Sequence, residues 1–174
     1  MTSGMTAATN DKKDTTGQPA DQKFLTFFLA GEEYGIEILK VQEIIGLLPI
    51  TRVLRTPPFI RGVINLRGKV ISVVDLRLKF GMEEIANTAE TCVIVVQAAG
   101  MEMGIIVDQV SEVLAINASE IEDTPTFGVT VNTDYILGVG KAQGKVKLLL
   151  DIDRVLSNQE LVDLRTSAVD SAML

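Results

Sequence analysis

Short apolar runs alternate along the chain with turns that carry glycine. Residues 24–29 and 34–36 flank the turn 30–33, and two longer apolar runs within 59–76 flank the step Arg67-Gly68. β-Branched and aromatic residues favour strands, and glycine supplies the positive φ that a tight reversal requires. The pattern therefore predicts two β-hairpins in the first half of the chain.

Two segments have the spacing of helices instead. Ile38, Val41 and Ile44 recur every three residues within 37–45, which predicts a short helix of about two turns. Ser157 and Glu160 have the spacing of a capping box, which predicts a C-terminal helix that frays over 166–174. Residues 50–54, between the prolines at 49 and 57–58, predict one more strand.

The second half of the chain repeats the first. Identical residue types recur after 69 positions at Gly31, Gly35, Val41 and Glu43, and after 76 positions at Gly62, Gly68 and Asp75. The approximate copies are 24–80 and 91–156. Arg67 is not repeated, because Gln143 stands at its equivalent position.

Duplicated short strands with brief helices predict a mainly β fold of two small barrels packed together. Each barrel is too small to bury enough apolar surface alone, so the pair is expected to fold as one unit. The sequence copies need not coincide with the barrels, because duplicated barrels can exchange strands.

Composition narrows the function. The 174 residues are 47% hydrophobic and carry a net charge of −7, which argues against nucleic acid as a partner. There is no polybasic cluster, no apolar run long enough to span a membrane and no signal-peptide segment, so we expect a cytoplasmic protein that does not insert into membranes. Residues 1–22 are almost entirely polar and predict a disordered tail.

The chain has no histidine and a single cysteine, Cys92. The missing histidine removes the commonest general base and the commonest metal ligand. Cys92 lies at the start of an apolar strand, where we expect it to act as a small hydrophobe. The acidic residues lack EF-hand spacing and the glycines are not followed by helices, so we expect neither a metal nor a cofactor.

Asp75 and Asp151 follow equivalent apolar strands and are the basis for one enzymatic alternative, a histidine-free hydrolase whose paired carboxylates share a proton. Neither aspartate is followed by small, turn-forming residues. Arg77 is near enough in sequence to neutralise Asp75. We therefore expect capping or ion pairing at Asp75 rather than catalysis.

Partner binding fits the sequence better. The apolar face of Ile38, Val41 and Ile44 has a duplicate in Val107, Val110 and Val113, and two short helices on two small barrels cannot bury every such position. Exposed apolar patches mark partner sites. Arg67, at a hairpin tip, can offer two hydrogen bonds to a partner's carboxylate or carbonyl.

Residues 33–44, 56–68 with Asn65-Leu66-Arg67-Gly68, and 73–77 closely resemble the CheW family of bacterial chemotaxis coupling proteins. The resemblance extends from about Phe24 to Leu164. It implies two SH3-like five-stranded β-barrels around a shared hydrophobic core, with short helices and a C-terminal helix, in a CheW-like domain at 23–165. It also implies an adaptor without enzymatic activity or cofactor.

The partners that the resemblance implies are the regulatory domain of the histidine kinase CheA and the methyl-accepting chemoreceptors. The protein would be a monomer alone and part of an ordered array at the membrane when its partners are present. The alternative is a CheW-like adaptor of a surface-motility or other non-flagellar chemosensory pathway.

The family's binding residues carry over by position. The receptor groove between the barrels would contain Ile38, Val41, Glu43, Ile44, Arg67, Met103, Val110 and Val113, with Gly62 supporting it. The kinase contact would use Ile50, Thr51, Arg52, Val53, Arg61 and Val70. A second kinase contact in the family uses an arginine and a phenylalanine; Phe127 matches the phenylalanine, and Glu122 stands at the arginine position.

Overall fold

The structure is a computed structural model that describes residues 21–123, 134–157 and 159–161. Its elements are the strands β1 (Asp21–Leu29), β2 (Glu32–Glu37), β3 (Val41–Gly46), β4 (Ile60–Leu66), β5 (Lys69–Asp75), β6 (Cys92–Ala98), β7 (Met101–Val107), β8 (Gln109–Asn117), β9 (Ile121–Glu122), β10 (Ile136–Ala142) and β11 (Lys145–Leu150), the helix α2 (Leu76–Lys79), and the 3-10 turns η1 (Ile38–Lys40) and η2 (Ala118–Glu120). Helical residues also occur at 159–161. The predictions for 1–20 and 166–174 lie outside the described residues.

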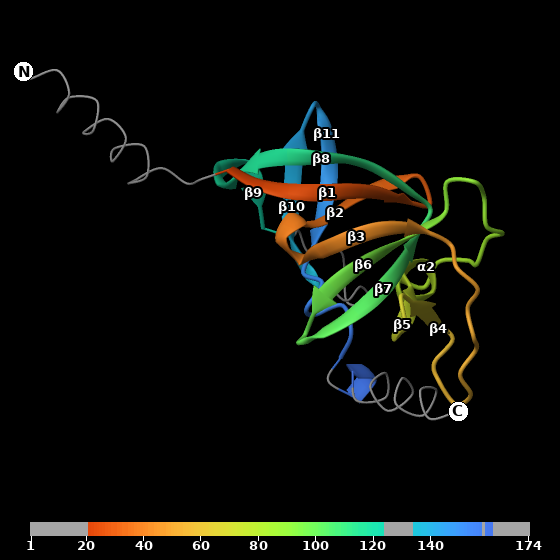
Figure 1. Cartoon of the computed structure of the whole chain (residues 1–174). Coiled ribbons are helices and arrows are strands. Elements are labelled where there is room, and N and C mark those ends of the chain that lie inside the picture. The colour runs from red at the N-terminus through yellow and green to blue at the C-terminus, as the bar shows by residue number, and fades with distance from the viewer. Residues whose placement is uncertain (1–20, 124–133, 158, 162–174) are drawn as a thin grey trace, which may run out of the picture.

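The strands form two sheets with matching order, as the prediction of two small barrels requires (Figure 1). The first sheet has the order β8-β1-β2-β11-β10-β9, and the second has the order β3-β6-β7-β5-β4. In each sheet one parallel pair joins the two halves of the chain, β11 with β2 in the first and β5 with β7 in the second. The sequence halves therefore exchange strands, so that each barrel takes a hairpin from both.

The described residues form three apolar clusters. One lies inside the first barrel around Phe24 and Leu149, and another lies inside the second barrel around Val73 and Val93. The largest joins both sheets and is called here the shared core. Stacked aromatic rings extend through it, with Phe80 and Tyr135 centroids 4.9 Å apart. Both barrels therefore contribute to one buried cluster, as a single folding unit would require.

The predicted hairpin at 59–76 is confirmed as β4 and β5, which pair from Ile60–Val74 to Leu66–Lys69. Its turn residues Arg67 and Gly68 have φ values of 52° and 86°. Positive φ at both central residues defines the type I′ turn that matches the twist of paired strands. The hairpin predicted at 24–36 is also present as β1 and β2, although β1 begins at Asp21, inside the predicted tail.

The predicted helix at 37–45 is wrong. Only η1 is helical, and Val41 to Gly46 form β3, which pairs with β6. The register of β3 against β6 shifts between Val41 and Glu43. Along β3 half-buried and exposed residues alternate, so the three-residue spacing joins the half-buried Val41 to the exposed Ile44 and does not mark one helix face. The duplicate residues likewise lie in strands, Val107 at the end of β7 and Val110 and Val113 in β8. A register shift separates Val110 from Val113 where β8 pairs with β1.

The strand predicted at 50–54 is reduced to a single bridge between Thr51 and Val63. The capping box at Ser157 is confirmed: the Ser157 amide donates to Glu160 Oε1 at 2.7 Å, and the Glu160 amide donates to Ser157 Oγ at 3.2 Å. Among the described residues, no helix has the length and apolar character needed to cross a membrane.

Candidate partner-binding surfaces

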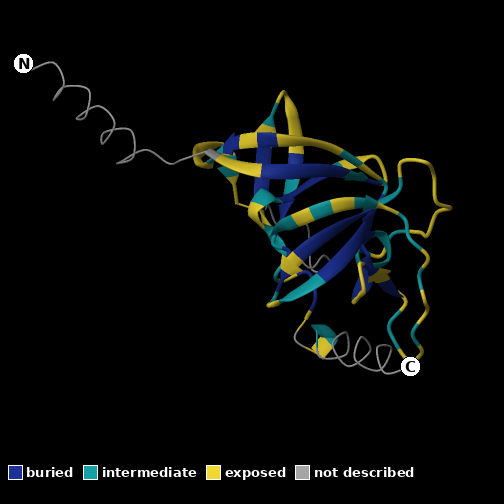
Figure 2. Cartoon of the chain, viewed as in Figure 1, coloured by how far each residue is buried: buried dark blue, intermediate teal, exposed yellow. Residues whose placement is uncertain are grey.

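The first candidate surface is formed by β3 and β8, each an edge strand of its sheet. In Figure 2, β3 alternates between half-buried and exposed residues, whereas β6 beside it is mostly buried. Ile44 on β3 is 45% exposed and Val113 on β8 is 50% exposed. Unpaired strand edges carrying exposed apolar side chains are suited to partner binding.

The two edges are linked through the middle of the molecule. Val41, from β3, and Val110, from β8, are half-buried and pack against the same shared core. Cys92 pairs with the end of β3 and its thiol is hydrogen-bonded by the backbone of Val110, while burial raises the pKa of this thiol. Cys92 is therefore a half-buried joint between the edges and packs against the shared core, in agreement with the expectation of a small hydrophobe rather than a nucleophile.

Arg67 lies beside this surface at the tip of the β4–β5 hairpin. Its guanidinium forms an ion pair with the Glu43 carboxylate on β3, and the hydrogen bond to Glu43 raises the pKa of Arg67. The turn is fixed by the Asn65 side chain, which accepts the Gly68 amide proton at 2.9 Å. The structure therefore brings Arg67 and Glu43 together, next to Ile44; the family resemblance assigned all three to the receptor groove.

Two other predicted receptor residues are less accessible. Met103 is 3% exposed and belongs to the shared core, and Ile38 is half-buried against the same core. Both side chains support the edge strands from inside. Sequence reasoning missed Leu39, which is 93% exposed in η1 immediately before β3; the assumed helix gave it no special position.

Gly62 lies away from these edges, against the segment predicted to contact the kinase. A Cβ at Gly62 would be 2.1 Å from the Thr51 carbonyl oxygen. This close approach allows Thr51 and Val63 to exchange two backbone hydrogen bonds of 2.8 Å each. Gly62 therefore fixes the position of residues 50–53 on the second barrel.

The kinase-side residues divide into buried and exposed groups. Ile50 packs against the core of the second barrel, and Val53 is half-buried. Thr51 and Arg52 are exposed, as is Val70 on β5. The neighbouring Leu54 is 84% exposed, and the sequence analysis did not single it out as a binding residue.

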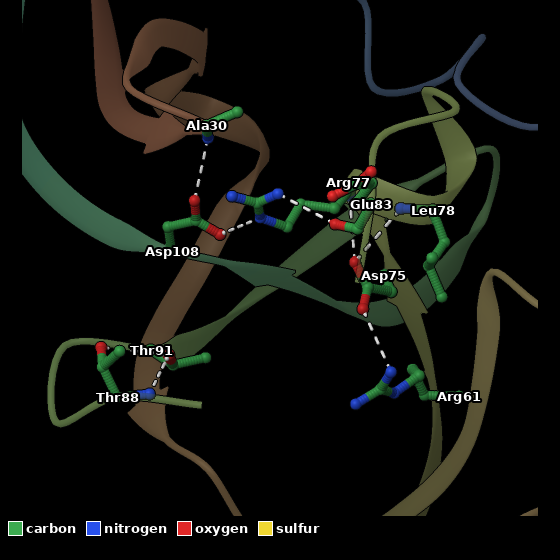
Figure 3. Close-up of polar contacts among 9 residues, drawn as sticks. All are labelled: Ala30, Arg61, Asp75, Arg77, Leu78, Glu83, Thr88, Thr91 and Asp108. Carbon is green, nitrogen blue, oxygen red and sulfur yellow. Dashed lines mark hydrogen bonds and ion pairs between the residues drawn. The ribbon is translucent and has the colours of Figure 1, made fainter. Parts of the chain in front are cut away.

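Arg61 has partners within the chain. Its guanidinium lies 3.4 Å from the Asp75 carboxylate (Figure 3). It also lies 2.5 Å from the Glu84 carboxylate. Burial raises the pKa of Asp75, although the amides of Leu78 and Arg77 and the charge of Arg61 oppose this rise. The Asp75 carboxylate is also the N-cap of α2, since it accepts the Arg77 amide at 3.0 Å.

The expected neutralisation of Asp75 by Arg77 is wrong. The Arg77 side chain points the other way and donates to Asp108 at 2.9 Å, as Figure 3 shows. The second Asp108 oxygen accepts the amide of Ala30 at 2.9 Å. Asp75 has the structural role expected of it, but the cation beside it comes from Arg61 on β4.

The paired-carboxylate alternative finds no support in the hydrogen bonding. Asp151 accepts the Asp153 amide and lies 3.6 Å from the Arg154 guanidinium. Both oxygens of Asp75 and both of Asp151 therefore face other groups, not a proton shared between the two aspartates. Among the described residues, no three acidic or cysteine side chains gather in a way that could hold a metal ion.

Glu122, at the position of the family's arginine, forms an ion pair with Lys141 at 2.6 Å. The acidic side chain thus has a cation within its own barrel. Phe127 lies outside the described residues.

Comparison with known proteins gives one consistent family. The family model described as CheW-like domain matches residues 23–160. "Chemotaxis protein CheW" of Klebsiella aerogenes is 44% identical over 83% of this chain and 87% of its own length, and the Bacillus subtilis protein of the same name is 36% identical over 79% and 88%. The crystal structure of the scaffolding protein TtCheW from Thermoanaerobacter tengcongensis has a TM-score of 0.74 and 34% identity, covering 80% of this chain and 95% of that one. The chain belongs to the CheW family of chemotaxis proteins.

Proposed function

We propose that this protein is a non-enzymatic chemotaxis adaptor that couples the tips of methyl-accepting chemoreceptors to the regulatory domain of a CheA-type histidine kinase. Family membership supports the adaptor role, since the curated relatives are chemotaxis proteins and the solved relative is titled a scaffolding protein. The protein is cytoplasmic and joins receptor arrays at the membrane through its partners.

One observation carries the receptor part of the proposal: two edge strands present half-exposed apolar side chains on either side of a joint at Cys92. A receptor helix lies against this surface and contacts Ile44 and Val113. Complete burial of such a side chain stabilises a complex by about 1.5–3 kcal/mol, so covering the exposed half of each contributes about 1 kcal/mol. Arg67 and Glu43 add polar contacts that set register more than affinity.

The kinase contacts the second barrel through residues 50–53 and the outer part of β5. Thr51, Arg52 and Val70 are exposed there, and Leu54 adds a large apolar side chain. Arg61 positions this surface through Asp75 and Glu84. Separate surfaces allow the adaptor to hold both partners at once.

The receptor surface can be tested by making the same substitution at an exposed valine on the surface and at an exposed valine outside it. Val113→Asp places a charge on the β8 edge, and Val146→Asp makes the same change at a valine on β11 that is 60% exposed. We expect Val113→Asp to weaken retention of a receptor-tip fragment by about tenfold or more, and Arg67→Ala to weaken it less, while Val146→Asp binds as wild type. Val110 is a poorer probe, because its side chain packs against the shared core.

The matched kinase variant is Val70→Asp, which we expect to weaken co-purification with CheA while receptor binding persists. Circular dichroism and thermal unfolding would check that each variant is folded. Equal receptor binding by Val113→Asp and wild type would contradict the proposed receptor surface, and failure of the wild-type protein to retain any CheA-type kinase would contradict the adaptor function.

A further inference from the structure

The two edge strands of the receptor surface are related residue by residue. A spacing of 69 positions relates the three members on β3 to three on β8: Val41 to Val110, Glu43 to Glu112 and Ile44 to Val113. The apolar pairs also have matching environments, half-buried for Val41 and Val110, and 45% and 50% exposed for Ile44 and Val113. Apolar contacts alone would therefore accept a helix in either direction along the surface.

The charged positions do not match. Glu43 is neutralised by Arg67, at the tip of its hairpin. The equivalent tip residue of the β10–β11 hairpin is the neutral Gln143. Glu112 is exposed, and its carboxylate has no hydrogen bond or ion pair with any residue that the structure describes. One end of the surface is therefore electrically compensated, and the other keeps a free negative charge.

The backbone at Glu112 is held in place although its side chain is not. The buried Thr26 hydroxyl donates to the Glu112 carbonyl at 2.9 Å and accepts its amide proton at 3.1 Å. Lys23, on the adjoining strand, pairs through its backbone with Ala115 and forms no ion pair with Glu112. The carboxylate is thus presented from a fixed strand, and no cation in the described part of the chain pairs with it.

We propose that Glu112 binds a lysine or arginine side chain of the receptor helix and thereby selects the direction in which that helix lies between β3 and β8. This rests on the proposed receptor surface. The reverse direction would leave the partner's cation beside the Glu43–Arg67 pair, where Arg67 repels it. Placing like charges together is an effective means of excluding a wrong orientation.

The neutral Gln143 supplies a direct test of this assignment. Its φ of 56° is close to the 52° of Arg67, so the same turn can carry an arginine at position 143. Gln143→Arg is expected to place a guanidinium near Glu112, as Arg67 is placed near Glu43, and to displace the receptor's cation. The variant should therefore bind the receptor more weakly although it adds a positive charge to a protein with a net charge of −7.

The experiment measures binding of a helical tip fragment of a methyl-accepting chemoreceptor to five forms of the full chain: wild type, Glu112→Gln, Gln143→Arg, the double variant, and Glu83→Gln. Glu83 is an exposed glutamate of the loop after α2, and its substitution is the matched change of charge. We expect Glu112→Gln to weaken binding about tenfold and to reduce its dependence on salt, since charge pairs at interfaces couple this strongly. Gln143→Arg should weaken receptor binding when it is made in the wild-type chain. It should have no further effect on binding when it is added to Glu112→Gln.

Charge reversal identifies the receptor residue. Glu112→Lys should abolish most binding, and replacing the correct lysine or arginine of the receptor fragment by glutamate should restore it; the position of that residue on the helix gives the direction. If Glu112→Gln and Glu83→Gln bind equally while Val113→Asp still weakens binding, this inference is overturned and the proposed surface stands. If the wild-type chain does not bind the fragment, both are overturned.

Discussion

Gly62→Ala is expected to be one of the most damaging small substitutions in the second barrel. The added Cβ would lie 2.1 Å from the Thr51 carbonyl oxygen and 3.0 Å from the Arg52 Cα, both parts of the backbone. In addition, Gly62 has a φ of 141°, which side-chain-bearing residues rarely adopt. The backbone conformation costs about 1–3 kcal/mol. Moving Thr51 away breaks two hydrogen bonds to Val63 worth about 1 kcal/mol each, so we expect a loss of about 3–5 kcal/mol.

Urea denaturation followed by circular dichroism measures this loss, with Gly46→Ala as the control. Gly46 has no atom within 4 Å of its added Cβ and no positive φ. Hydrogen exchange should show faster exchange of the Val63 amide in Gly62→Ala, and kinase binding should fall more than receptor binding. Stability equal to that of Gly46→Ala, with the Val63 amide still protected, would refute the reasoning.

Two further changes probe the supports of the candidate surfaces. Thr26→Val keeps the side-chain shape but removes the hydroxyl that pairs with both backbone groups of Glu112, so we expect about 1–3 kcal/mol of destabilisation in urea and faster exchange of the Glu112 amide. Acid should also destabilise the fold: burial raises the pKa values of Asp153 and Glu160, but lysine and amide hydrogen bonds outweigh it and hold both below the usual 3.8 and 4.5. Because these pKa values are lowered in the folded state, the two carboxylates stabilise the protein above pH 5, and the stabilisation is lost as pH falls through and below 4. The urea midpoint should therefore fall from pH 7 to pH 3. In Asp153→Asn it should fall less steeply.

Much of the fold could be predicted because its turns depend on local chemistry. Arg67-Gly68 has a glycine where positive φ is required, and the flanking β-branched residues leave little choice but a hairpin. Strand exchange between the halves depends on contacts distant in sequence, namely the pairing of β11 with β2 and of β5 with β7. The chain pattern permitted this arrangement without specifying it.

The helix at 37–45 shows how a local pattern misleads. An apolar residue every third position matches a helix face, but β3 produces the same spacing because it carries apolar residues on both of its faces, Val41 half-buried and Ile44 exposed. Which of these residues is covered depends on the neighbouring strand β6, and the sequence does not display that pairing. The incorrect helix still led to Val41, Ile44, Val110 and Val113. These are apolar residues of edge strands, and such residues are candidates for partner binding whether the segment is a helix or a strand.

Side-chain partners were harder to predict than positions. Sequence proximity suggested Arg77 for Asp75, whereas the fold brings Arg61 to Asp75 and directs Arg77 to Asp108. The exposed Leu39 and Leu54 were missed because exposure depends on what the rest of the fold leaves uncovered. Position along the chain alone cannot show which leucines lack a covering element.

The two halves of the chain form equivalent charged contacts between the barrels, called inter-barrel joints. The acidic and basic residues are exchanged between the two joints. On one side, Asp108 accepts the amide of the Ala30 turn and binds Arg77 of α2. On the other, Asp153 accepts the amide of the equivalent Ala99 turn at 2.8 Å and binds Lys40 of η1 at 2.7 Å.

In the first joint the residue just before the edge strand β8 is the acidic Asp108. In the second joint the residue just before the edge strand β3 is the basic Lys40. Each joint connects a turn of one barrel to an element of the other and lies next to the start of β8 or β3. These charged contacts therefore hold the two edges in a fixed relation to each other. A receptor helix that contacts both Ile44 and Val113 requires that relation, so the inter-barrel ion pairs matter to binding although their side chains need not touch the partner.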